Sequence, residues 1–74
     1  MKLPVCSGKS AIRAFERAGW IPDRQEGSHV SLYQPGNPVV LTIPLHRELG
    51  HGLLRDLIHK SGLTVEEFGK LLKS

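Results

Sequence analysis

The feature that most constrains the fold is a change in the spacing of apolar residues, from helical to alternating and back to helical, within only 74 residues. A helix buries one stripe of side chains and a half-buried strand buries every second side chain, so each change of period marks a new element. A chain this short buries only about 60 % of the surface that its unfolded form exposes, so its elements must share one small core. We therefore expect a single domain over residues 1–74.

The first helical segment is expected from Ser7 to Ala18, with Ser7 as its N-cap and Gly19 as its stop. Four apolar residues share one side of this helix, and they are Ala11, Ile12, Phe15 and Ala18. Three basic residues recur at every fourth position on the opposite side, and they are Lys9, Arg13 and Arg17. Such a row can hold the phosphates and 2′-hydroxyls of structured RNA, or can simply be the solvated side of an amphipathic helix.

The middle of the chain predicts three antiparallel strands joined by tight turns. The first strand is expected over Trp20 to Gln25, at an edge of the sheet because Pro22 cannot donate to a ladder. A turn at Glu26-Gly27-Ser28 leads to the second strand, from His29 to Gln34. A second turn precedes the third strand, which Pro44 closes.

The alternation along the second strand separates a core face from an exposed face. Val30 and Leu32 face the core, so His29, Ser31 and Tyr33 lie on the other face. Tyr33 there can stack on a base, donate a hydrogen bond to a phosphate, or be an ordinary cross-strand aromatic residue.

Helical spacing returns after a polar loop expected from Leu45 to Gly52. The apolar stripe of the second helix consists of Leu53, Leu54, Leu57 and Ile58. Gly62 ends that helix, and Thr64 with Glu67 forms a capping box for a short last helix. The order helix, three strands, helix, short helix predicts an α+β fold, with a three-stranded antiparallel sheet covered by helices on one face.

Composition excludes several classes of protein. No apolar run approaches the roughly 18 residues of a membrane span, and the N-terminus lacks the apolar core of a signal peptide, so we expect a cytoplasmic protein without a membrane partner. The single cysteine, Cys6, precludes an internal disulfide, and although a helix start can lower a thiol pKa, we expect it to be inert. The four histidines lack paired short spacing, so we expect no metal and no cofactor. The net charge of +3 is compatible with an anionic partner.

Several short motifs resemble the HicA toxin family in their order and spacing. They are Ser7-Gly8-Lys9, Phe15-Glu16-Arg17-Ala18-Gly19-Trp20, Gly27-Ser28-His29, Ile43-Pro44-Leu45-His46 and Gly52-Leu53-Leu54-Arg55-Asp56-Leu57-Ile58. The resemblance implies a double-stranded-RNA-binding-like fold that cleaves messenger RNA, has His29 as its catalytic residue and is inhibited by a HicB-type antitoxin. One departure is Leu53, which stands where the family often has Thr.

Histidine suits metal-independent RNA cleavage, in which the 2′-hydroxyl attacks the neighbouring phosphorus. An unperturbed pKa of about 6.5 lets an imidazole serve as base or acid near neutrality. Gly27 and Ser28 permit a nucleic-acid backbone to approach His29, and Ser28 and His46 are possible assisting residues. For His46, a loop histidine bonded to the backbone is an equally good interpretation.

Two other functions stay open at this point. A non-catalytic module of the same fold would hold structured RNA through its basic residues and would not need His29. A protein–protein adaptor would show no affinity for RNA. Cleavage by the wild type and by a His29→Ala variant separates these alternatives.

Overall fold

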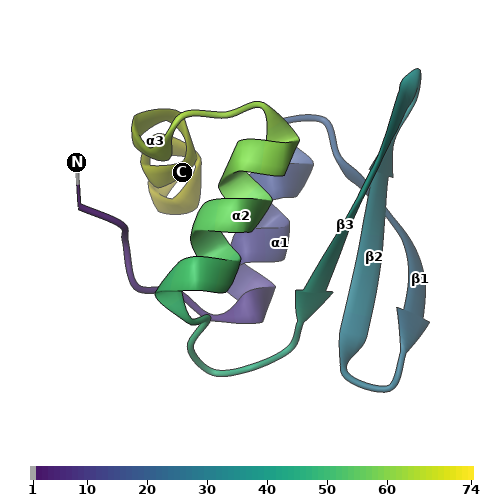
Figure 1. The fold of residues 1–74 in the computed structure, drawn as a ribbon, viewed down its shortest axis with the longest axis horizontal. Coiled ribbons are helices and arrows are strands. Elements are labelled where there is room, and N and C mark those ends of the chain that lie inside the picture. Colours follow the sequence, from purple (N-terminus) through teal and green to yellow (C-terminus); the bar gives the residue numbers. More distant parts are fainter. Residues whose placement is uncertain (1) are drawn as a thin grey trace.

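A computed structural model of the chain describes residues 2–74 and confirms the expected α+β fold (Figure 1). The elements, in chain order, are α1 (Gly8–Arg17), β1 (Ile21–Glu26), β2 (His29–Gln34), β3 (Asn37–Pro44), α2 (His51–Ser61) and α3 (Val65–Lys73). The strands form an antiparallel sheet in the order β1-β2-β3. This is the arrangement of a double-stranded-RNA-binding-like domain with an additional C-terminal helix.

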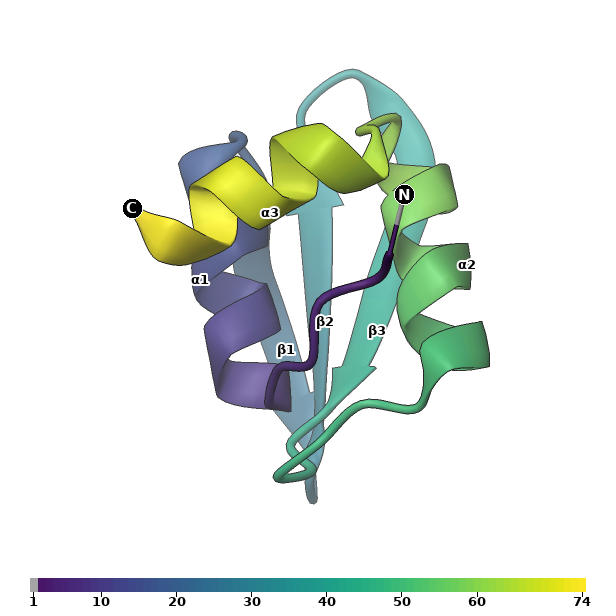
Figure 2. The same cartoon turned by 90° about the vertical axis from the view of Figure 1, so that its left-hand side faces the viewer.

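The helices cover one face of the sheet and leave the other face open. Figure 1 shows all three helices on the same side of the strands, and Figure 2 shows α1 and α2 side by side over the sheet with α3 lying across one end of them. The strand β1 is exposed along its whole length, as expected for an edge strand that contains Pro22. The pairs Leu32–Leu41 and Val30–Ile43 set the register of β2 against β3, and all four residues are buried.

The predicted helix caps are confirmed. The Ser7 hydroxyl accepts a hydrogen bond from the Ser10 amide at 3.1 Å at the start of α1. At α3, the Thr64 hydroxyl accepts from the Glu67 amide at 3.0 Å, while the Glu67 carboxylate accepts from the Thr64 amide at 2.8 Å. These reciprocal bonds are the expected capping box, and they define where the last helix begins.

Three sequence predictions are wrong in detail. The first strand begins at Ile21 rather than Trp20, because the Trp20 amide donates to the Phe15 carbonyl at 3.0 Å, which leaves its side chain buried below α1. The second helix begins at His51, inside the expected loop, because the Leu54 amide closes the first turn onto the Gly50 carbonyl at 3.0 Å. Leu53 is 38 % exposed rather than buried, since its side chain points outside the stripe that faces the core.

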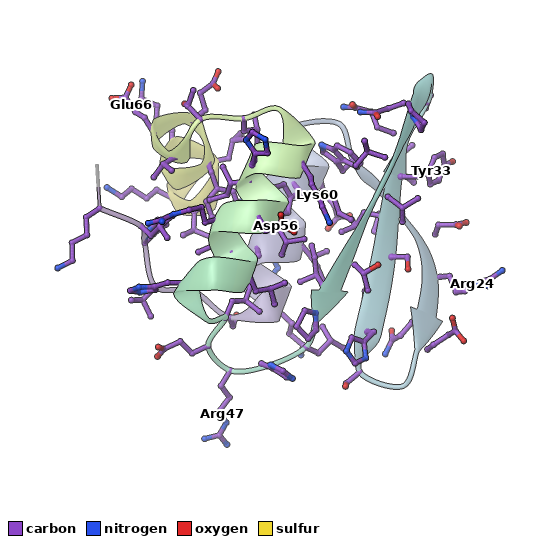
Figure 3. All side chains as sticks on the ribbon, viewed as in Figure 1. Arg24, Tyr33, Arg47, Asp56, Lys60 and Glu66 are labelled. Carbon is purple, nitrogen blue, oxygen red and sulfur yellow. The ribbon has the colours of Figure 1, made fainter. Side chains whose placement is uncertain are left out.

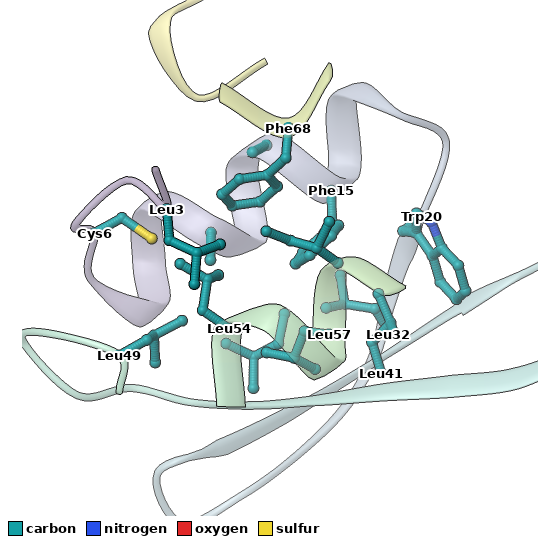
Figure 4. Close-up of a cluster of buried hydrophobic side chains, with 14 residues drawn as sticks. Leu3, Cys6, Phe15, Trp20, Leu32, Leu41, Leu49, Leu54, Leu57 and Phe68 are labelled. Carbon is teal, nitrogen blue, oxygen red and sulfur yellow. The ribbon is translucent and has the colours of Figure 1, made fainter. Parts of the chain in front are cut away.

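The core lies between the sheet and the helices and continues under α3 (Figure 4). Phe15 and Trp20 are buried as expected, and the ring of Phe68 in α3 lies 5.0 Å from that of Phe15. The sequence analysis missed three buried residues in irregular segments, and they are Leu3, Cys6 and Leu49. The segment that contains Leu3 and Cys6 therefore closes the core on the side away from the sheet (Figure 2).

Candidate functional site

His29 is exposed at the start of β2, directly after a two-residue turn. Gly27 is the first residue of that turn and has a φ of +58°, a conformation that costs glycine little. A glycine with positive φ at this position is typical of a type II′ hairpin turn, whose twist matches that of the flanking strands. The turn thus presents His29 at the tip of the sheet, where a large ligand can reach it.

Main-chain hydrogen bonds join three segments at this tip, which we call the site end. The Leu45 amide donates to the Ser28 carbonyl at 2.6 Å and extends the β2–β3 ladder past its last pair. The Gly8 amide donates to the His46 carbonyl at 2.9 Å, which ties the start of α1 to the same loop. The site end therefore combines the hairpin turn, the loop after β3 and the first turn of α1.

Gly8 allows this close approach because it has no side chain. It is buried, and a Cβ atom at residue 8 would collide with the Pro44 carbonyl oxygen and lie 3.1 Å from the Leu45 Cα. These are backbone atoms, so no side-chain rotation can relieve the overlap. The spacing between α1 and the end of β3 consequently requires glycine at this position.

Gly8→Ala is expected to reduce the free energy of unfolding by about 1–3 kcal/mol, the usual cost of overpacking. The comparison is a urea unfolding curve of the variant against that of the wild type. Gly52→Ala is the matched control, because residue 52 also lies in a first helical turn but has open space around its missing side chain. Equal unfolding midpoints for Gly8→Ala and the wild type would show that the site end can separate without cost.

The site end brings together four of the residues singled out in the sequence. Ser28 and His29 come from the hairpin, His46 from the loop after β3, and Lys9 from the first turn of α1. Lys9, His29 and His46 are exposed, and their side chains make none of the hydrogen bonds or ion pairs formed within residues 2–74. Two histidines and one lysine, all exposed to solvent, thus come from segments that main-chain hydrogen bonds hold together.

Glu26 is a further residue of the site end that the sequence analysis placed in the turn. The hairpin register pairs it with His29 across β1 and β2. Directly opposite residues of an antiparallel pair have Cβ atoms about 4.5–5.5 Å apart, so the side chains of Glu26 and His29 start from neighbouring points of the sheet. A two-residue turn at Gly27-Ser28, once recognised, implies this pairing from the sequence alone.

The basic row of α1 is exposed as expected but does not converge on His29. Lys9 begins the row at the site end, and Arg17 lies about 12 Å further along the helix axis. The Arg17 guanidinium donates to the Leu71 carbonyl at 2.8 Å, near the C-terminus of α3. Arg17 therefore ties α1 to α3, and this contact is a structural role that sequence reasoning did not predict.

Tyr33 lies on the open face of the sheet, four residues along β2 from His29. Its exposed fraction is 40 %, and the alternating burial of β2 confirms that it shares a face with His29 and Ser31. Figure 3 shows Tyr33 and Arg24 pointing away from the helices, and shows Arg47 extending from the loop after β3. Arg47 is an exposed cation near the site end to which the sequence analysis assigned no role.

Three further features of the described residues concern the reactivity of the Cys6 thiol, metal binding and membrane spanning. Cys6 is buried, and this burial raises the pKa of its thiol rather than lowering it, which supports the expectation that Cys6 is inert. Within residues 2–74, no three His, Cys, Asp or Glu side chains lie close enough to hold a metal ion. Over the same residues, no helix has the length and apolar character needed to cross a membrane.

Two comparisons with known proteins bear on the site. Residues 8–63 match a family model described as the HicA toxin of bacterial toxin-antitoxin. The matched region contains the whole site end together with α1, the sheet and α2. A comparison with curated proteins found no match.

Proposed function

Because the chain belongs to the HicA toxin family and is thus a toxin of a toxin–antitoxin system, we propose that it is an endoribonuclease that cleaves messenger RNA with His29 as its catalytic residue. The observation that carries this proposal is the geometry of the site end. The exposed imidazole of His29 lies at the tip of the β1–β2 hairpin. Main-chain hydrogen bonds hold the loop that carries His46, and the start of α1 that carries Lys9, beside this tip.

The proposed reaction uses the ribose of the substrate as the nucleophile. His29 accepts the proton of a 2′-hydroxyl, the 2′-oxygen bonds to the adjacent phosphorus, and the bond from phosphorus to the 5′-oxygen breaks. The products are a 2′,3′-cyclic phosphate and a 5′-hydroxyl, whose oxygen needs a proton from an acid. Positioned acid–base groups of this kind contribute about 10²–10⁴-fold each to the rate.

The other residues of the site end have assisting roles in this proposal. His46 is the candidate acid for the leaving oxygen, because an imidazole carries a transferable proton near neutral pH. Lys9 supplies positive charge for the phosphorane, and Ser28 offers a hydroxyl to the phosphate next to His29. Glu26 lies opposite His29 and can orient its ring.

We further propose that a HicB-type antitoxin inhibits the enzyme by covering the site end. His29, His46 and Lys9 are exposed at the site end, so a protein surface can reach them directly. Neither the hollow between Lys2 and α3 nor the one along α2 at His59 includes any residue of the site end.

The test is incubation of the purified chain with a synthetic messenger fragment in excess chelator. We expect cleavage to 2′,3′-cyclic phosphate and 5′-hydroxyl ends, and inhibition by an equimolar HicB-type antitoxin. A 2′-O-methyl copy of the fragment is the control, because it lacks the attacking hydroxyl and should stay intact. RNA that is bound but not cut would instead support the non-catalytic binding module, and absence of any binding would support the adaptor.

A further inference from the structure

The open face of the sheet carries an exposed apolar row that the core does not use. Ile21 pairs with Tyr33 across β1 and β2. The pairing of β2 with β3 is irregular between Leu32 and Gln34, but Val40 is exposed and adjoins Leu41, the buried partner of Leu32, so it lies on the same open face near Tyr33. The exposed fractions are 40 % for Ile21, 40 % for Tyr33 and 54 % for Val40. We call these three residues the apolar row.

The apolar row is continuous with the proposed catalytic residue. Ser31, with Arg24 on one side and Thr42 on the other, forms the next row of the same face. His29 follows two residues further along β2, which places it about 13 Å from Tyr33 at the usual rise of a strand. Along β2, the face therefore changes from the apolar row to a polar row of two hydroxyls and one guanidinium, and then to the imidazole of His29.

We propose that this face binds an unpaired stretch of the RNA substrate, with one base stacked on Tyr33 and a phosphate further along the same strand at His29. The proposal rests on the proposed function and adds to it the substrate class, which is single-stranded rather than duplex RNA. Bases within a duplex are stacked on one another and present mainly phosphates and 2′-hydroxyls outward, to which an apolar row offers nothing. An unpaired base exposes its π-face, and an aromatic ring on a sheet is a common platform for it.

The flanking side chains fit the same ligand. Ile21 and Val40 widen the apolar surface around the Tyr33 ring, so a purine or a pyrimidine can lie across it. Arg24 offers a cation to the backbone phosphate, and the hydroxyls of Ser31 and Thr42 can hydrogen-bond the ribose. A protein partner could also cover an apolar row, but the continuity of this face with His29 favours the substrate.

The test measures the binding of short RNAs that contain 2-aminopurine. It uses the His29→Ala variant, so that the RNA is not cleaved during the measurement. Stacking on Tyr33 should quench the fluorescence of an unpaired oligonucleotide. Adding Tyr33→Leu should remove the quenching and weaken binding about tenfold, within the range for loss of a base–aromatic stack. Tyr33→Phe should keep both the quenching and the RNA affinity, because it keeps the aromatic ring. Leu53→Ala, an exposed apolar residue on α2, is the control.

The same substitutions in the otherwise native chain should show their effect on cleavage. Tyr33→Leu is expected to raise KM about tenfold and to change kcat little, with an unchanged thermal midpoint, because the side chain lies outside the core. The proposal would be overturned if the Tyr33→Leu variant bound the RNA as tightly as the protein with Tyr33 does. It would also be overturned if the protein bound an RNA duplex more tightly than the single strands of that duplex. It would also be overturned if Tyr33→Leu weakened only the binding of the antitoxin. If RNA stacked on Tyr33 but the native chain cleaved no RNA, the proposed nuclease activity would be rejected, while the proposed binding of RNA by the sheet face would be supported.

Discussion

Replacing His29 with alanine is expected to reduce RNA cleavage by about 10²–10⁴-fold, the contribution of a positioned general acid–base group. The side chain is exposed at the start of β2 and contributes nothing to the core, so the variant should unfold at the same urea concentration as the wild type. The measurement is the single-turnover rate on a messenger fragment, with enzyme in excess so that binding does not limit the rate.

The matched control for this experiment is His59→Ala. His59 is also an exposed histidine, but it lies near the end of α2, outside the site end. The control should cleave RNA at the wild-type rate, and so should exclude a general effect of losing an imidazole. A native rate for His29→Ala would reject its catalytic role. RNA binding and antitoxin binding should survive in His29→Ala, since Lys9 and Tyr33 are unchanged.

Phe68→Ala is expected to reduce the free energy of unfolding by about 3–5 kcal/mol, through lost burial and the cavity that remains. Phe68 is fully buried and its ring lies 5.0 Å from that of Phe15. Domains of this size are stable by only about 0.05–0.15 kcal/mol per residue, so this single change removes a large share of the total. The measurement is urea unfolding followed by circular dichroism.

The control for Phe68→Ala is Val5→Ala, because Val5 is an apolar residue that is 66 % exposed. Its substitution should change the free energy of unfolding by less than about 0.5 kcal/mol. Phe68 lies in α3, beyond residues 8–63 that match the family. A small effect of Phe68→Ala would mean that α3 is peripheral to the stability of the matched region; a large effect would make α3 part of its core.

The elements could be predicted because their signals are local. Ser7 and the Thr64–Glu67 capping box bond within three residues, so their roles follow from the sequence alone. Leu53 was misplaced because the side of α2 that faces the core is decided by packing against β3 and α3. The burial of Leu49 could not be predicted, because its irregular segment has no apolar period. The Leu49 amide donates to the Cys6 carbonyl, a contact between two segments far apart in the sequence.

The candidate site shows the same division. His29 was identified from its motif and its exposure from the alternation of β2, and both concern neighbouring residues. The role of Glu26 depends on the register of the hairpin, and the contact of Arg17 with the Leu71 carbonyl joins residues 54 positions apart. The pairing of Glu26 follows from the sequence once Gly27-Ser28 is recognised as a two-residue turn, whereas no pattern in the sequence indicates the contact of Arg17.

The way in which the site end is held has a consequence for how such a toxin can change. Its three segments are joined through main-chain amides and carbonyls of Ser28, Leu45, His46 and Gly8, and not through their side chains. Substitutions at exposed positions such as Arg47 can therefore alter what the surface recognises while the framework around His29 stays in place. Under the proposed function, new RNA preferences and new antitoxin pairings can then arise by single mutations that cost little stability.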